Sequence, residues 1–337
     1  MENALCPVLI GREAELSELE DAMLEANRGG GKVVLLSGDA GMGKTRLATE
    51  LQSRARQIGM TTLWGGSSEA DLELPYLPFV EALGNQLSGP ALEGIRRSLG
   101  PVRRELAHLF PQLEIDLSPP DVESLQGKLR LFEAILVLLT LLADGHGLLL
   151  VIADLHWADA STLELLDYMT RRLRSSRIMV LGTYRGDELH RKHPLQPMIQ
   201  GWRRAGMRII ELQPLDADRV ADMVHAIFDV TEVGEDTRRF LHERSEGNPF
   251  VLEEILKAAV DRGDFFRTES GWGRKELSEM RVPDTVKANI LLRLHRLSQD
   301  QVAVLRIAAV PGPTFTYASP EALTGLPEPT FQEPVGV

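Results

Sequence analysis

The sequence has little cysteine, few aromatic residues and no excess of basic charge. Cys6 is the single cysteine among 337 residues, so no disulfide can form within the chain and a disulfide-linked scaffold is excluded. Aromatic residues are only 5% of the chain, which favours aliphatic helices packed on a sheet over a β-sandwich. Acidic residues outnumber basic ones 49 to 37, and the net charge of −12 argues against a general nucleic-acid-binding surface.

Long hydrophobic runs are also missing. The longest apolar stretch, residues 134–143, is interrupted by Thr140, whereas a membrane-spanning helix needs about 20 apolar residues. The first residues lack the basic and apolar regions of a secretory signal. With 43% hydrophobic and 26% charged residues, the composition is typical of a soluble globular protein, and the length predicts about two domains. We expect a cytoplasmic protein with no membrane partner.

Apolar runs alternate with amphipathic stretches through the first two thirds of the chain. Leucine spacing predicts helices at 12–27, 45–58, 124–143 and 161–174. Short apolar runs predict buried strands at 33–36, 61–64, 148–153 and 178–183. Strands that alternate with helices predict an α/β fold, in which a parallel sheet is covered by helices on both faces.

The pattern changes near Pro214, where we place a domain boundary. Short helices are predicted at 216–228, 235–245 and 249–262, followed by a loop at 263–277 and another helical stretch at 283–309. The proline-rich end of the chain predicts neither a helix nor a strand and is typical of a fold cut short, or equally of a disordered tail.

A glycine-rich loop follows the first predicted strand. Residues 38–45 match G-x-x-x-x-G-K-[ST] in full, with a strand before the loop and a helix after it. Such a loop points backbone N–H groups and a helix N-terminus at phosphates, while Lys44 reaches the β- and γ-phosphates and Thr45 ligates Mg²⁺. The predicted nucleotide-binding residues here are Gly38, Asp39, Ala40, Gly41, Met42, Gly43, Lys44, Thr45 and Arg46.

Two further residues follow neighbouring predicted strands. Asp154 ends the apolar run 148–153, and we predict that it completes the Mg²⁺ site with Thr45. Arg185 follows the run 178–183, where it could sense a γ-phosphate and stabilise transferred charge, although a solvated arginine would look the same. Lys44, Asp154 and Arg185 are therefore the predicted catalytic residues, whereas a histidine beside a tryptophan, as at His156, is more often structural.

The base of the nucleotide is predicted from a motif that the sequence does not contain. A GTPase would carry an N-K-x-D-like guanine clamp on a later strand, and the sequence contains none. We therefore expect ATP or ADP, together with Mg²⁺, as the ligands of this chain.

In this order, the motifs resemble the STAND class of P-loop ATPases, and closely the N-terminal AAA ATPase-like region of large LuxR-family transcriptional regulators. Besides the phosphate loop, the resemblance is carried by the segments LIGREAEL at 9–16, LHWAD at 155–159, GTYR at 182–185 and EGNPFVLEE at 246–254. It implies that Gly11 and Arg12 lie near the adenine and that Pro249 caps the adenine from a helical lid.

The resemblance also implies an ATP-dependent signal-transduction switch. In such proteins an ADP-bound closed form opens on ATP exchange and then self-associates or exposes an output domain. The implied domains are a P-loop ATPase domain at 1–213, an all-α lid at 214–280 and the start of a truncated winged-helix region at 281–337. DNA would be bound only through a C-terminal output domain that this chain lacks.

One departure from the family pattern bears on hydrolysis. The family carries two consecutive acids at the end of the second motif strand, where this chain has Ala153 followed by Asp154. Hydrolysis could then be slow or absent, so a hydrolysis-deficient nucleotide-binding scaffold is the first alternative to an ATPase. A P-loop kinase acting on a small molecule is a weaker alternative. A ring-forming AAA+ motor is disfavoured because the Asp-Glu pair is missing.

Overall fold

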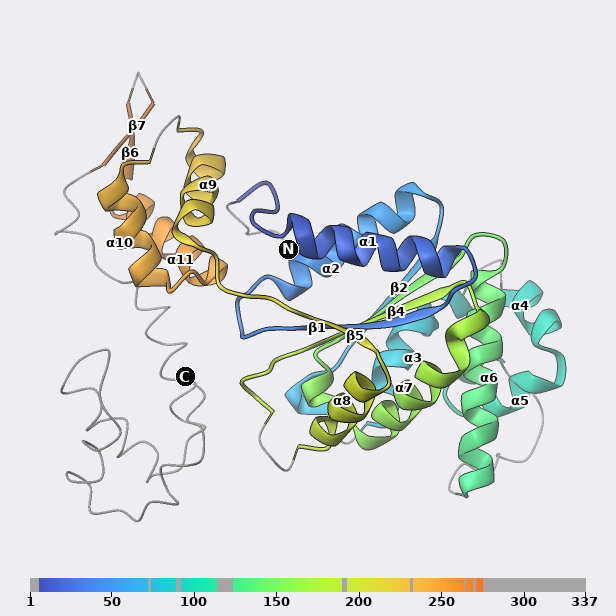
Figure 1. Cartoon of the computed structure of the whole chain (residues 1–337). Coiled ribbons are helices and arrows are strands. Elements are labelled where there is room, and N and C mark those ends of the chain that lie inside the picture. The colour runs from blue at the N-terminus through green and yellow to red at the C-terminus, as the bar shows by residue number, and fades with distance from the viewer. Residues whose placement is uncertain are drawn as a thin grey trace, which may run out of the picture. The chain divides into compact units, whose positions relative to one another are not determined.

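The chain divides into two compact units, one comprising residues 9–213 and the other residues 1–8 together with 214–337. The computed structural model (Figure 1) describes residues 6–71, 74–88, 92–113, 124–189, 193–230, 233–263, 265–268 and 271–274. The predicted stretch 283–309 and the proline-rich end lie outside these residues.

A five-stranded sheet forms the centre of the 9–213 unit. Its strands are β1 (Lys32–Ser37), β2 (Thr61–Gly66), β3 (Leu148–Ala153), β4 (Ile178–Tyr184) and β5 (Arg208–Glu211). All neighbouring pairs are parallel, and the order across the sheet is β2-β3-β4-β1-β5. Because β4 lies between β3 and β1 and all three are parallel, the residues that follow these strands lie close together at one edge of the sheet.

Helices cover both faces of this sheet. The helices described in this unit are α1 (Glu13–Asn27), α2 (Lys44–Gln57), α3 (Leu77–Gly84), α4 (Leu92–Leu99), α5 (Arg103–Leu106), α6 (Leu125–Ala143), α7 (Ala160–Arg172) and α8 (Leu195–Arg204). On β1, Val34 and Leu36 point into a core shared with α1 and α2, whereas Leu35 points into the core shared with α3, α6 and α7. The predicted α/β fold is confirmed, with α1 and α2 on the opposite face from α3, α6, α7 and α8 (Figure 1).

Short 3₁₀ helices lie between these elements: η1 (Glu69–Asp71), η2 (Asn85–Leu87), η4 (Gly100–Val102), η5 (Pro111–Leu113), η6 (Leu155–Trp157) and η7 (Leu173–Ser175). One of them, η6, directly follows β3, all six residues of which are buried. Asp159 then caps α7, since its carboxylate accepts hydrogen bonds from the backbone N–H groups of Ser161 and Thr162. Asp159, the acid of the 155–159 segment, thus has a structural task in starting a helix.

The edge strand β5 was not among the predicted strands. It pairs with β1 through Val34↔Arg208 to Ser37↔Glu211, and of its four residues only Ile210 is buried. A four-residue edge strand with two charged ends carries too short an apolar run to be recognised by hydrophobic pattern. Strand β5 nevertheless bears on the site, because the sheet unit ends at Gln213, just after this strand.

The second unit contains α9 (Ala217–Phe228), α10 (Glu235–Ser245) and α11 (Pro249–Asp261), close to the three predicted helices. The prediction of a loop at 263–277, and with it an all-α lid, is wrong. Strands β6 (Phe265–Thr268) and β7 (Gly271–Arg274) form an antiparallel hairpin, consistent with the strand propensity of the Phe-Phe and Thr residues in β6. Among the described residues, no helix is both long and apolar enough to cross a bilayer.

Candidate functional site

The phosphate-type loop connects β1 to α2. Gly41 and Gly43 have φ angles of +85° and +91°, which L-residues with side chains rarely adopt. α2 begins at Lys44, and within the described chain no side chain caps its N-terminus. The first backbone N–H groups and the positive end of the helix dipole can therefore face an anion. Thr45 is exposed on this first turn and Arg46 is half-buried.

Lys44 is folded back onto the loop. Its Nζ donates hydrogen bonds to the carbonyl oxygens of Gly38 at 2.6 Å and Asp39 at 2.8 Å, and only 7% of the residue is exposed. Burial, and after it the neighbouring positive charge of Arg185, lower the pKa of Lys44 to about 8. The ammonium is thus held in the curl of the loop, where an anionic ligand would strengthen its charged form.

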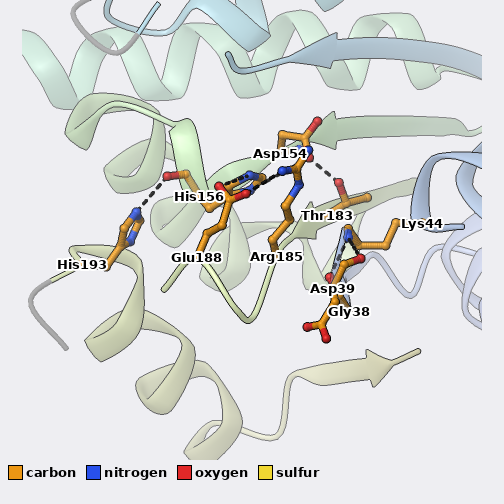
Figure 2. Close-up of polar contacts among 9 residues, drawn as sticks. All are labelled: Gly38, Asp39, Lys44, Asp154, His156, Thr183, Arg185, Glu188 and His193. Atoms are coloured by element: carbon orange, nitrogen blue, oxygen red, sulfur yellow. Dashed lines mark hydrogen bonds and ion pairs between the residues drawn. The ribbon is translucent and has the colours of Figure 1, made fainter. Parts of the chain in front are cut away.

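Asp154 and Arg185 lie at the same edge of the sheet (Figure 2). The Asp154 backbone N–H donates to Thr183 Oγ1 at 3.0 Å, which joins the end of β3 to the end of β4. Burial raises the pKa of Asp154, whereas the charges of Arg185 and Lys44 lower it. The structure therefore brings the three predicted catalytic residues to one place, each after a different strand of the β3-β4-β1 set.

Arg185 is held by two neighbours. Its Nη1 donates to Glu188 Oε1 at 2.5 Å, and its Cζ lies 4.9 Å from the centroid of the Trp157 ring. Glu188 was not predicted as a site residue. A lone glutamate three positions after an arginine carries no motif, and only the turn after β4 brings its carboxylate back onto Arg185.

His156 is buried between two carboxylates. Its Nε2 lies 3.4 Å from Glu188 Oε2 and its Nδ1 lies 4.0 Å from Asp154 Oδ1. Burial lowers the pKa of His156 to about 3, so the ring is neutral near pH 7 and these approaches are not ion pairs. Within the described chain, neither ring nitrogen has a hydrogen-bond partner.

The segment before α1 holds Gly11 and Arg12, which the sequence predicts near an adenine. Gly11 N–H donates to Glu13 Oε1 at 3.2 Å. Arg12 is 4% exposed, and its Nη2 donates to the carbonyl oxygens of Met42 at 3.3 Å and Gln213 at 2.7 Å. The Arg12 guanidinium is therefore bound to the phosphate loop and to the residue at which the sheet unit ends.

Pro249 belongs to the other unit, and its role at an adenine stays a prediction. It occupies the first turn of α11, whose cap Asn248 accepts hydrogen bonds from the Phe250 and Val251 backbone N–H groups. A Cβ on the preceding Gly247 would lie 2.2 Å from a backbone oxygen of Leu215. Helix capping and close packing thus account locally for the Gly-Asn-Pro sequence.

A cavity of about 850 Å³ lies elsewhere in the sheet unit. Its lining includes Lys32 and Arg208, which begin β1 and β5, whereas the phosphate-type loop follows the other end of β1. The cavity is therefore not part of the cluster around Lys44, Asp154 and Arg185.

The sheet order, the glycine loop and the helix that follows it define a P-loop NTPase fold. Residues 8–181 match the family model described as AAA ATPase domain, which is more than half of the chain. The chain belongs to the AAA ATPase domain family, and this membership supports nucleotide binding.

A solved structure agrees with this fold. The ORC2 protein of Aeropyrum pernix, solved as ADPNP and ADP complexes, is 17% identical with a TM-score of 0.51 over 91% of this chain and 76% of that one. The A. pernix ORC1 protein, solved in complex with DNA, is 17% identical with a TM-score of 0.47 over 95% and 79%. At this identity the likeness concerns the fold alone.

One curated relative extends well beyond the length of this chain. An uncharacterized protein of Rhizobium meliloti (strain 1021) is 26% identical over an alignment of 343 positions, and the alignment covers 91% of this chain. The chain spans 30% of the length of that relative.

Proposed function

We propose that this chain binds ATP and Mg²⁺ at residues 38–45 and acts as the nucleotide-gated part of a STAND-type signalling switch. The observation that carries the proposal is the convergence of Lys44, Asp154 and Arg185 after three adjacent strands of the sheet. Parallel strands in α/β folds bind ligands at this edge. An uncapped helix N-terminus, a buried ammonium and a guanidinium suit a polyphosphate better than a neutral ligand.

Each residue has a proposed task that follows from its chemistry. The loop N–H groups and Lys44 hold the β- and γ-phosphates, and Arg185 pairs with the γ-phosphate. Gly11 and Arg12 place the loop and lie toward the base, while Pro249 packs on the adenine from the second unit. The site would then distinguish ATP from ADP by the γ-phosphate, and this difference would be transmitted to the second unit.

The donor set fits Mg²⁺. The Thr45 hydroxyl is exposed at the start of α2, and the Asp154 side chain is partly exposed beside the loop. In the described part of the chain, no group of three or more His, Cys, Asp or Glu side chains could hold a metal ion. A magnesium ion here would therefore depend on phosphate oxygens and water as well as on these two ligands, and it would neutralise phosphate charge.

The switch role rests on the path of the chain. The polypeptide passes between the two units twice, after Val8 and after Gln213, and Arg12 lies near both passages through its hydrogen bond to Gln213. A change at the loop that moves the Met42 carbonyl would thus reach the linking segments. We propose that the chain is the ATPase part of a LuxR-type regulator, which self-associates on activation and binds DNA through a separate output domain.

A second candidate function is a nucleotide-binding scaffold without turnover. Ala153 ends β3 and is buried, at the position where the resemblance implies an additional acid. If that acid normally orients water, nucleotide would bind and remain unhydrolysed.

The switch proposal is tested by comparing the oligomeric state and hydrodynamic radius of the purified chain with Mg-ADP and with Mg-ATP. We expect a larger radius or self-association with ATP, and no such difference in Lys44→Ala. An equal radius and mass with both nucleotides would contradict the switch. Phosphate release measured on the same samples separates an ATPase from the scaffold, since the scaffold releases none.

A further inference from the structure

The Arg185–Glu188 pair lies at the edge of the proposed γ-phosphate site. The two side chains are 26% and 17% exposed, so the pair is partly shielded from water. The turn after β4 closes with a hydrogen bond from the Leu189 N–H to the Gly186 carbonyl at 3.3 Å, which brings Glu188 back over Arg185. The Trp157 ring lies under the guanidinium, so Arg185 is contacted from two sides.

The charges around Glu188 indicate that its pair with Arg185 bears on nucleotide binding. Arg185 influences both Lys44 and Asp154 electrostatically, so the guanidinium is already close to the loop and to the proposed metal ligand. His156 approaches the other oxygen of Glu188, but its ring is neutral because it is buried. The carboxylate of Glu188 thus meets a guanidinium much as a phosphate oxygen would.

We propose that Glu188 is a specificity-determining residue that occupies Arg185 in the nucleotide-free protein and competes with the γ-phosphate of ATP for it. This inference rests on the proposed function and concerns the regulation of the same site. ADP has no γ-phosphate and leaves the Arg185–Glu188 pair in place. ATP engages Arg185 only as the pair opens, so the strength of the pair sets the ratio of the ATP and ADP affinities.

The test measures the dissociation constants of Mg-ADP and of a Mg-bound non-hydrolysable ATP analogue on the purified full chain. The variants are Glu188→Gln, Arg185→Ala and the double variant. Glu133→Gln is the matched control, because Glu133 also pairs with an arginine, Arg172, at 2.8 Å, but on α6 and α7 away from the loop. Thermal melting shows that each variant is folded.

Glu188→Gln keeps the shape of the side chain and removes its charge. We expect the ATP analogue to bind roughly three- to tenfold more tightly and ADP to bind within about twofold of wild type. Arg185→Ala should weaken the ATP analogue alone, and Glu188→Gln should give no gain in the Arg185→Ala background. Glu133→Gln should leave both dissociation constants unchanged.

Several results would overturn the inference. An equal gain for ADP and the analogue, or a gain that persists without Arg185, would show that Glu188 acts as a general negative charge. A loss of analogue affinity in Glu188→Gln would show that Glu188 orients Arg185 for the phosphate. If wild type binds both nucleotides and Glu188→Gln leaves the ratio of the ATP and ADP affinities unchanged, only this inference is contradicted. If wild type binds neither nucleotide, the proposed function is contradicted as well.

Discussion

Arg12 and Gln213 are 201 positions apart, yet the Arg12 Nη2 donates a 2.7 Å hydrogen bond to the Gln213 carbonyl. The same nitrogen donates to the Met42 carbonyl within the phosphate-type loop at 3.3 Å. One buried guanidinium therefore joins the start of the sheet unit, its last residue and the loop. Burial lowers the pKa of Arg12, while Glu15, paired with it at 3.3 Å, opposes that effect.

Arg12→Ala tests this junction. The substitution leaves two carbonyl oxygens without a charged donor, so we expect a loss of about 2–3 kcal/mol in the free energy of unfolding. Arg28→Ala, at an exposed position that follows α1, serves as the control and should cost less than about 0.5 kcal/mol. Urea unfolding of the three proteins measures both values, and equal midpoints for Arg12→Ala and wild type would refute a structural role for Arg12.

Gly43→Ala separates backbone strain from phosphate binding. A Cβ at Gly43 meets nothing within 4 Å, so its cost of about 1–2 kcal/mol comes from the φ of +91°. Gly29 has a φ of +99° and equally open space, but it lies after α1, outside the loop. Gly29→Ala should therefore destabilise the protein by a similar amount and still bind nucleotide, whereas Gly43→Ala should lose most of its ATP affinity in a titration. Equal affinities would contradict the placement of phosphates at this loop.

The pKa of Lys44, about 8, predicts a pH dependence of binding. Above pH 8 the free protein must take up a proton before its ammonium can hold a phosphate, so ATP affinity should fall by up to about tenfold per pH unit. A Lys44→Arg variant remains protonated throughout and should show a flatter profile. Isothermal titrations between pH 7 and 9.5 give both profiles, and parallel curves would be inconsistent with a lowered pKa.

The same shift affects stability with the opposite sign. Between about pH 8 and the ordinary lysine pKa of 10.5, the unfolded chain binds more protons at this position than the folded protein. The Lys44 contribution should therefore raise the free energy of unfolding as the pH increases through this window. Comparing wild type with Lys44→Met by denaturant titration isolates the contribution, and a wild-type curve parallel to that of Lys44→Met would rule it out.

Ala153→Asp restores the pair of acids at the end of β3. If the missing acid limits turnover, phosphate release should rise at least roughly tenfold, because a positioned base typically gives more than that. The new carboxylate is largely buried and should cost about 1–3 kcal/mol of stability. Ala153→Asn has nearly the same shape without the charge and should give the stability loss without the gain in rate. Equal rates in all three proteins would show that Ala153 does not limit hydrolysis.

The sequence predicted the sheet well where strands are wholly buried. Residues 148–153 form an unbroken apolar run because β3 is central and parallel, so pattern and structure coincide. The edge strand β5 was not predicted because only Ile210 of its four residues is buried, and strands β6 and β7 fall in a stretch for which the sequence predicts a loop. Short strands gain their order from pairing with a neighbour, which a local pattern does not contain.

The site was predictable as far as motifs extend. Lys44, Asp154 and Arg185 follow strands, and the sheet order brings them together as expected for one edge. Glu188 was missed because its contact with Arg185 depends on the turn after β4. The buried hydrogen bonds of Arg12 were missed because their acceptors are backbone carbonyls, which no residue type marks.

Isothermal titration of the purified chain shows most directly whether the loop at residues 38–45 binds ATP with Mg²⁺. We expect saturable binding of Mg-ATP by wild type, weaker or no binding of Mg-GTP, and loss of ATP binding in Lys44→Ala while its melting temperature remains close to that of wild type. Wild type that binds no ATP, or a folded Lys44→Ala that binds ATP as tightly as wild type, would contradict ATP binding at this loop.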